Sequence, residues 1–116
     1  MIQLHSSSKI LIAVDPVDFR RGIDGLCGFC RNELEHNPSS GTIYVFTNRS
    51  RTQARMLVYD GSGYWLMTKR LSKGRFSKWP KSSNPIGECQ AKELIIFLWG
   101  ENPDHTSDPR GWSRIG

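Results

Sequence analysis

ARMLVYDGSGYWLMTKRL, residues 54–71, carries the clearest local structural signal in the chain. Two strand-like runs of aliphatic and aromatic residues, 54–60 and 64–71, flank a short segment that contains two glycines. The Asp60-Gly61 pair supplies the left-handed backbone conformation that a tight hairpin requires. The sequence therefore predicts two antiparallel strands that belong to a β-meander.

Two further strands and a helix are predicted N-terminal to this hairpin. The runs KILIAVD (9–15) and TIYVFTN (42–48) are rich in β-branched residues, and each predicts a strand. Between them, apolar residues recur at helical steps of three and four: Phe19, Ile23, Leu26, Cys30 and Leu34. We expect this helix to begin with Asp18 as its N-cap and to end at Asn37-Pro38.

The last third of the chain predicts a short strand, a loop and a second helix. RFSKWP (75–80) is expected to form a last strand that Pro80 ends, and KSSNPIG (81–87) a loop. ECQAKELIIFLWG (88–100) predicts a helix with Gly100 as its C-cap. The polar segment 104–116, rich in Pro and Gly, is expected to be loop or disordered.

A chain of 116 residues is long enough for one domain with one modest hydrophobic core. We expect residues 1–103 to form this domain. The predicted fold is α+β: a largely antiparallel β-meander sheet of four to five strands, with the two helices on one face and the strand order left open.

Positive charge is concentrated in the middle of the chain. The net charge is +5, yet residues 49–81 contain nine Lys or Arg and a single acid, Asp60, while the remainder contains seven Lys or Arg and ten acids. Such a regional excess predicts an anionic partner. Nucleic acid is a suitable partner, because Lys and Arg neutralise phosphates while exposed aromatic rings stack on bases.

Ten residues of this region are candidate nucleic-acid contacts. The expected phosphate contacts are Arg49, Arg51, Arg55, Lys69, Arg70, Lys73, Arg75 and Lys78, and the candidate stacking residues are Trp65 and Trp79. Strand alternation sends the adjacent Lys69 and Arg70 to opposite faces, so that they cannot share one buried face. The alternative is an ordinary solvated sheet face whose aromatic residues belong to the core.

Cys27 and Cys30 form a C-x-x-C pair, a pattern found in redox sites and in zinc sites. Redox pairs of this kind lie where a strand meets the N-terminus of a helix, whereas these two residues belong to the apolar side of the predicted helix. Neither a second C-x-x-C nor a spaced histidine pair completes a zinc site. We therefore expect core cysteines, no metal and no other cofactor.

Four acids raise the alternative of a metal-dependent nuclease, because two-metal phosphodiester chemistry requires clustered carboxylates: Asp15, Asp18, Asp24 and Asp60. Cap and turn roles already account for Asp18 and Asp60, and Asp24 projects from a different side of the predicted helix. We expect no catalytic activity, although Asp15, Asp18 and Asp60 would converge if the ends of their elements met at one edge of the sheet.

Neither export nor membrane insertion is predicted. The chain has no run of eighteen apolar residues, and its N-terminus lacks the basic region and apolar core of a signal peptide. Three cysteines cannot all pair within one chain, which disfavours a secreted protein stabilised by disulfides. We expect a cytoplasmic protein.

Four ordered motifs resemble one protein family. They are DFRRGIDGL (18–26), NPSSGTIYVFTNRSR (37–51), YDGSGYWLMTKRLSKGRFSKWP (59–80) and the closing helix. Over about residues 8–100, the chain resembles the small TnpB-type accessory protein encoded by the second reading frame of IS-66 group insertion sequences. This protein is distinct from the RNA-guided nucleases that share the TnpB name. Tyr59, where the family usually has Trp, and the CGFC segment depart from the family pattern.

The resemblance implies a role in transposition of a bacterial mobile element, beside a separate, larger transposase that carries the catalytic acids. We therefore expect a non-catalytic accessory factor that binds DNA, at the ends of the element, through the basic β-meander. The alternative is a protein-interaction module that recruits or orients the cognate transposase. For that role, Phe97 and Trp99 of the second predicted helix are the expected exposed apolar contacts.

Overall fold

The computed structural model describes residues 9–99, which form five strands and two helices. The strands are β1 (Ile10–Ala13), β2 (Ile43–Thr47), β3 (Gln53–Tyr59), β4 (Tyr64–Arg70) and β5 (Ile86–Cys89). The helices are α1 (Ile23–Asn32) and α2 (Ala91–Trp99). The predicted tail, 104–116, lies outside the described residues, and the domain limits 1–103 stay a prediction.

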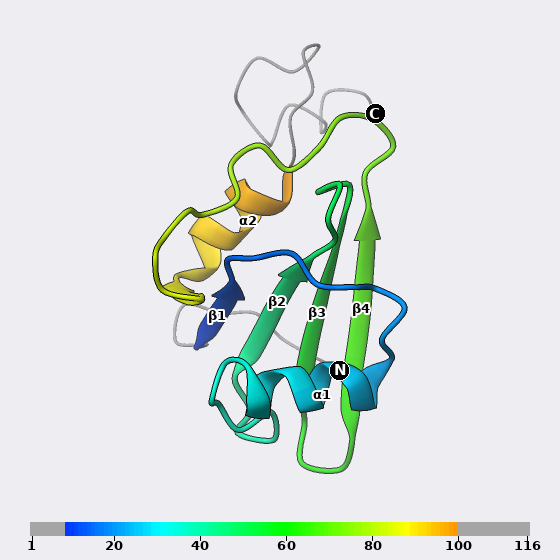
Figure 1. Cartoon of the computed structure of the whole chain (residues 1–116), viewed down its shortest axis with the longest axis vertical. Coiled ribbons are helices and arrows are strands. Elements are labelled where there is room, and N and C mark those ends of the chain that lie inside the picture. The colour runs from blue at the N-terminus through cyan, green and yellow to red at the C-terminus, as the bar shows by residue number, and fades with distance from the viewer. Residues whose placement is uncertain (1–8, 100–116) are drawn as a thin grey trace.

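The strands form one sheet in the order β4-β3-β2-β1-β5, four of which are labelled in Figure 1. β2, β3 and β4 form the predicted meander, and β3 pairs with β4 from Gln53 opposite Arg70 to Tyr59 opposite Tyr64. Gly61 in the connecting turn has a φ of 101°, the left-handed conformation expected of this hairpin. The α+β class and the largely antiparallel sheet are therefore confirmed.

β1 supplies the one parallel pairing among the described strands. It pairs in parallel with β2 and antiparallel with β5. Parallel neighbours cannot be joined by a tight turn, so the chain crosses over between β1 and β2, and α1 lies within this crossover. As a result, the carboxyl ends of β1 and β2 lie at the same edge of the sheet.

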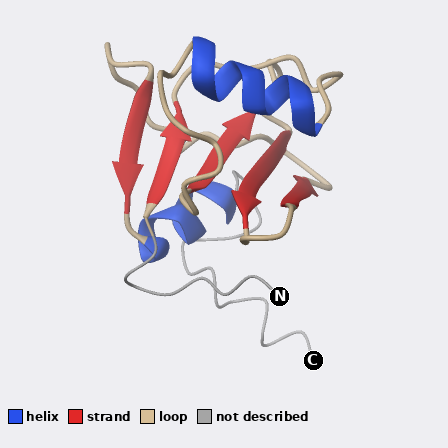
Figure 2. Ribbon diagram, turned by 90° about the horizontal axis from the view of Figure 1, so that it is seen from below, coloured by secondary structure: helices blue, strands red, loops and turns tan. Residues whose placement is uncertain are grey.

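The two helices lie on opposite faces of the sheet, as Figure 2 shows, so their predicted placement on one face is wrong. Leu26 and Cys30 of α1 pack in one buried cluster, whereas Leu94 of α2 packs in another. β1 and β2 are buried at every position, and their alternating side chains contribute to both clusters. The expected single core is therefore divided into two layers.

α1 is shorter than predicted: it begins at Ile23, after Gly22 as N-cap, and ends at Asn32. Asp18 is not the N-cap. Its carboxylate accepts hydrogen bonds from the backbone N–H and the guanidinium of Arg20, in a turn that precedes the helix. The apolar periodicity extends beyond the helix because flanking loop residues pack in the same cluster.

Residues 75–80 form no strand, contrary to prediction. Phe76 and Trp79 are both buried in the cluster that contains Leu94, and a spacing of three does not place two side chains on one face of a strand. Trp79 Nε1 donates a hydrogen bond to the Ala13 carbonyl oxygen at 3.0 Å. The segment is therefore a loop anchored by two aromatic rings.

β5 occupies residues that were expected to be loop and helix. Ile86–Cys89 forms this edge strand by pairing with β1, with Cys89 opposite Ile10. α2 then begins at Ala91, where Glu93 Oε1 accepts a hydrogen bond from the Gln90 backbone N–H in the manner of a capping box. The predicted C-cap, Gly100, lies outside the described residues. Neither helix is long and apolar enough to cross a membrane.

The buried position of Trp79 generates a stability prediction. Trp79→Ala should lower the free energy of unfolding by about 3–5 kcal/mol, the usual cost of deleting a large buried aromatic side chain. Trp79→Phe retains a ring and removes the hydrogen bond to Ala13, so its cost should be smaller, about 1–3 kcal/mol. Urea denaturation measures both variants, and wild-type stability of Trp79→Ala would contradict the buried position.

Candidate nucleic-acid interface

Three connecting segments leave strand ends at one edge of the sheet, the edge towards which the arrows of β1, β2 and β4 point in Figure 1; the segment after β1 then crosses in front of the sheet towards α1. They are the segment 14–22 after β1, the turn 48–52 between β2 and β3, and the segment 71–85 after β4. They leave the same edge because β1, β2 and β4 all run towards it, with Arg70 at the end of β4 opposite Gln53 at the start of β3.

Backbone hydrogen bonds fasten these segments together. The Val17 N–H donates to the Thr47 carbonyl oxygen at 2.9 Å, which ties the first segment to the end of β2. The Leu71 N–H donates to Thr52 O at 2.9 Å, and the Phe76 N–H donates to Arg51 O at 2.7 Å. These hydrogen bonds therefore bring the three segments together near the strand ends.

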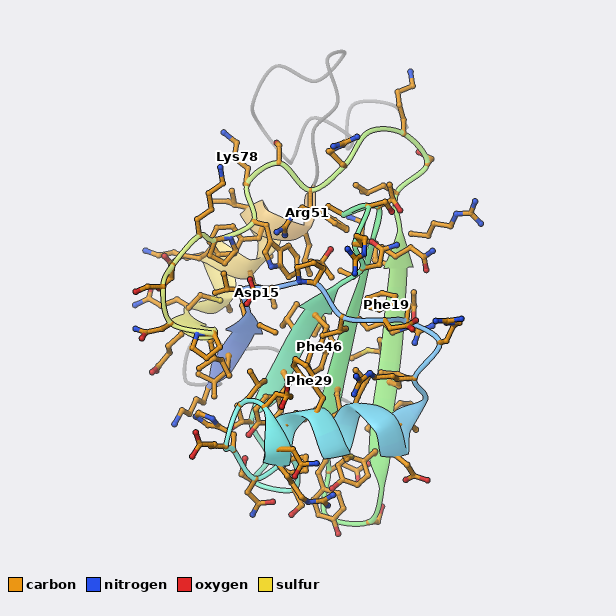
Figure 3. The ribbon with its side chains drawn as sticks, viewed as in Figure 1. Asp15, Phe19, Phe29, Phe46, Arg51 and Lys78 are labelled. Atoms are coloured by element: carbon orange, nitrogen blue, oxygen red, sulfur yellow. The ribbon has the colours of Figure 1, made fainter. Side chains whose placement is uncertain are left out.

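This edge of the sheet is strongly basic. Residues 14–22, 48–53 and 70–81, here called the basic edge, contain nine Lys or Arg and two acids. The cations are Arg20, Arg21, Arg49, Arg51, Arg70, Lys73, Arg75, Lys78 and Lys81, and the acids are Asp15 and Asp18. Eight of the nine cations are exposed and Arg51 is half-buried. Figure 3 shows Arg51 and Lys78 at this end of the molecule.

Six of the predicted phosphate contacts therefore belong to the basic edge: Arg49, Arg51, Arg70, Lys73, Arg75 and Lys78. Arg51 differs from the others, because its φ of 58° lies in the left-handed region that non-glycine residues seldom adopt. Its Nη1 atom is buried and has no hydrogen-bond partner within the described part of the chain.

Arg55 joins elements of the fold. Its Nη1 donates to the carbonyl oxygens of Phe19, at 2.7 Å, and Arg21, at 3.1 Å. Its Nε donates to Thr68 Oγ1 at 3.1 Å, and its guanidinium carbon lies 4.5 Å from the centroid of the Phe19 ring. The side chain thus holds the segment after β1 against β3 and β4.

Lys69 also makes a structural contact. Its Nζ donates a hydrogen bond to the Leu98 carbonyl oxygen at 2.7 Å, near the C-terminus of α2, where a positive charge is favourable. Burial lowers the pKa of this lysine. Lys69 therefore lies on the α2 face of the sheet, and Arg70, at the end of β4, belongs to the basic edge.

The two predicted stacking residues have different environments. Trp79 is 4% exposed and leaves no ring face for a base, so its predicted stacking role is wrong. Trp65 is 43% exposed on the edge strand β4, where its Nε1 donates to Asp60 Oδ2 at 2.7 Å. Trp65 lies near the β3–β4 hairpin, at the opposite end of these strands from the basic edge.

A cleft that sequence reasoning missed opens between two segments of the basic edge. It has a cavity volume of about 780 Å³ and is lined by residues 16–20 and 48–50 together with Gln53 and Arg55. Ligands commonly bind outside the carboxyl ends of parallel strands, which is where this cleft lies. To predict this cleft, one would have to know that β1 pairs in parallel with β2. The alternation of side chains along a strand does not reveal which strands pair or in which direction.

The candidate catalytic carboxylates are not brought together. Asp15 and Asp18 follow β1, whereas Asp60 lies in the hairpin at the opposite end of β3 and β4. Asp24 belongs to the first turn of α1. Among residues 9–99, no group of three or more His, Cys, Asp or Glu side chains is placed to hold a metal ion.

The cysteines are core residues. Cys27, Cys30 and Cys89 are buried free thiols, and Cys27 and Cys30 pack in the cluster beneath α1. Burial raises the pKa of Cys30 to about 12 and that of Cys89 to about 11, which disfavours the reactive thiolate form. The expected packing role of the C-x-x-C pair is consistent with these environments.

Fold and site define a small α+β protein in which nine of the sixteen Lys and Arg belong to one edge of a mixed sheet. The chain matches the family described as IS66 Orf2 like protein over residues 8–107. It therefore belongs to the IS66 Orf2-like family, and the expected resemblance to the TnpB-type accessory protein is confirmed.

Two curated relatives come from Sinorhizobium fredii (strain NBRC 101917 / NGR234). The uncharacterized protein y4jC is 41% identical over 76 residues, which cover 66% of this chain and 65% of that protein. The uncharacterized protein y4hO is 30% identical over 116 residues, which cover all of both chains. No solved structure matches this chain.

The Asp60 turn generates a prediction on pH. Hydrogen bonds from the Ser62 backbone, the Trp65 indole, the Ser62 hydroxyl and the Gly63 backbone lower the pKa of Asp60 from 3.8 to about 2. Because the folded-state pKa is the lower one, the stabilisation is fully present above about pH 4 and is lost as the pH falls towards 2.

Asp60→Asn should remove this pH-dependent contribution. Its stability should therefore approach that of the wild type as the pH falls from 4 to 2. Thermal unfolding of both proteins at several pH values measures the difference. A difference that stays constant over this range would show that the carboxylate titrates alike in the folded and unfolded chains.

Proposed function

We propose that this protein is a non-catalytic accessory factor in transposition that binds DNA through the basic edge. The observation that carries the proposal is the gathering of nine cations, from three separate segments, against only two acids. Cations clustered on one surface neutralise several phosphates along a DNA backbone. Membership of the IS66 Orf2-like family supports DNA of the insertion sequence as the partner.

The contact surface is a loop-bearing edge and not a face of the meander. Arg55 and Lys69 are engaged with other parts of the fold, whereas the cations of the basic edge, apart from Arg70 at the end of β4, belong to the segments between strands. Asp60 lies at the far end of β3 and β4. The resulting charge asymmetry favours approach of DNA to the basic edge, since an oriented field steers charged partners.

Strand cleavage belongs to the separate transposase in this proposal. Phosphodiester chemistry of the two-metal type needs convergent carboxylates, and Asp15 and Asp60 belong to opposite ends of the strands. The two acids of the basic edge include Asp18, which is paired with Arg20 at 2.7 Å. The protein's contribution is binding and positioning of DNA.

The proposal predicts binding that weakens with salt. Fluorescence anisotropy with labelled DNA from the end of the element should detect binding at low ionic strength, and the logarithm of the affinity should fall linearly with the logarithm of salt concentration. The double variant Arg75→Ser/Lys78→Ser should make this slope shallower, by about 0.9 for each phosphate that the variant no longer neutralises.

The matched control is Arg31→Ser/Lys92→Ser, which removes two exposed cations of α1 and α2 outside the basic edge. This control should bind as the wild type does. The proposal is overturned if the protein does not bind DNA at low salt, or if the affinity does not depend on salt concentration. It is also overturned if the two double variants weaken binding equally.

A second candidate function is recruitment of the transposase, and α2 provides the observation that favours it. Ile95 and Ile96 are 52% and 50% exposed, although both are large apolar residues. The expected contact Phe97 is half-buried against the core cluster, and the side chain of Trp99 lies outside the described residues. The candidate apolar contacts are therefore Ile95 and Ile96.

Co-purification of the tagged protein with the transposase, after nuclease treatment, tests this second function. If α2 is the docking surface, Ile95→Ser/Ile96→Ser should abolish the complex, because these substitutions remove exposed apolar area. Arg75→Ser/Lys78→Ser, the matched variant at the basic edge, should retain it. A complex that survives the isoleucine substitutions would contradict docking on α2.

A further inference from the structure

The cleft of the basic edge has the size and position of a ligand site. Its volume of about 780 Å³ lies within the roughly 300–1,000 Å³ range of small-molecule sites. One wall is the segment 16–20 that follows β1, and the other is the turn 48–50 that follows β2. The Val17 N–H donates to Thr47 O, which ties the first wall to the end of β2, where the second wall begins.

Arg55 lines this cleft and is held in one orientation. A guanidinium carries five N–H donors, and the bonds to Phe19, Arg21 and Thr68 use only its Nη1 and Nε atoms. Nη2 makes no bond within residues 9–99, and it is not among the buried unpartnered atoms, so it is open to solvent. A pre-oriented guanidinium binds phosphate without the entropic cost of ordering a flexible side chain.

Arg49 provides a second cation at the cleft. Its side chain is exposed and forms no hydrogen bond or ion pair with the rest of the described chain. Arg20 also lines the cleft, but it is paired with Asp18, and hydrogen bonds from Arg20 lower the pKa of Asp18 to about 2. The unneutralised positive charge of the cleft therefore comes from Arg49 and Arg55.

The same cleft contains an aromatic ring and an amide. Phe19 is half-buried, and the side-chain amide of Gln53 is unpartnered within the described chain. By contrast, the Asn48 side chain is already engaged, since its Oδ1 accepts hydrogen bonds from the Thr52 and Gln53 backbone N–H groups. A free amide offers both a donor and an acceptor to the edge of a base.

We infer that this cleft binds one unpaired nucleotide of DNA, with its phosphate at Arg55 and Arg49 and its base beside Phe19 and Gln53. A base within a duplex is stacked and cannot enter a cleft, whereas an unpaired base can be taken up together with its phosphate. The inference deepens the proposed function, on which it rests, and adds a preference for single-stranded DNA or for ends with unpaired nucleotides.

The experiment compares a short labelled oligo(dT) with a blunt duplex, using the full chain and fluorescence anisotropy. Arg49→Ser should weaken oligo(dT) binding roughly tenfold, the order expected when one charged hydrogen bond is removed. Gln53→Ala should weaken oligo(dT) binding more than duplex binding, because it removes an amide and no charge. Asp18→Asn, which frees Arg20 from its ion pair, should strengthen oligo(dT) binding.

Arg55 is left intact in these variants because its bonds support the fold. Titration of thymidine monophosphate, thymidine and inorganic phosphate against the protein, followed by amide chemical shifts, locates the site. We expect thymidine monophosphate to shift the amide resonances of residues 16–20 and 48–50. These shifts support the inference if they are larger than those caused by phosphate or by thymidine alone. Equal shifts with phosphate and the monophosphate would overturn it, because the cleft would then take only an anion.

The two proposals fail in different ways. The cleft site is overturned if the protein binds duplex DNA in a salt-dependent way but shows no preference for oligo(dT) and no effect of Gln53→Ala. The basic edge would then remain as a duplex-binding surface. Absence of all DNA binding at low salt overturns both. Oligo(dT) binding that Gln53→Ala weakens, without any duplex binding, supports the cleft site and restricts the protein to single strands.

Discussion

The parallel pairing of β1 with β2 is the constraint on which the rest of the structure depends. It requires a crossover, and the crossover places α1 on one face of the sheet, while α2 covers the other. It also directs two strand ends and their following segments to one edge. The Val17 N–H ties the segment after β1 to the end of β2 by donating to Thr47 O. The cleft and the basic edge both result from this arrangement.

The parts of the fold that depend on local sequence were predictable, and the parts that depend on distant partners were not. The β3–β4 hairpin follows from two apolar runs and Asp60-Gly61, which are adjacent in the chain. β5 has the sequence IGEC, which carries little strand propensity and becomes a strand through pairing with β1. Apolar periodicity identifies the helical side chains that pack, but it does not specify which face of the sheet they cover.

The candidate site, like the fold, was predictable where it depends on local sequence and unpredictable where it depends on contacts between distant residues. The excess of cations is a property of the sequence, yet their roles depend on contacts between distant residues. Arg55 bonds to the carbonyl oxygen of Phe19, and Lys69 to that of Leu98. Trp79 reaches Ala13 across the core. No pattern within a short window separates these structural residues from exposed neighbours such as Arg70 and Lys78, because the distinction arises only when the strands are ordered in the sheet.

Two features of the basic edge lower the stability of the fold: the backbone conformation of Arg51 and the clustering of positive charge. Arg51 adopts a left-handed φ of 58°, a conformation that costs about 1–3 kcal/mol for a non-glycine residue, and its Nη1 atom is buried without a described partner. The nine cations of the edge also repel one another. A surface shaped only by folding would gain stability by dispersing these charges and by placing glycine at position 51. In the proposed function, a phosphate backbone bound at this edge offsets the repulsion among its cations, so the clustering of charge that weakens the isolated fold strengthens the proposed complex.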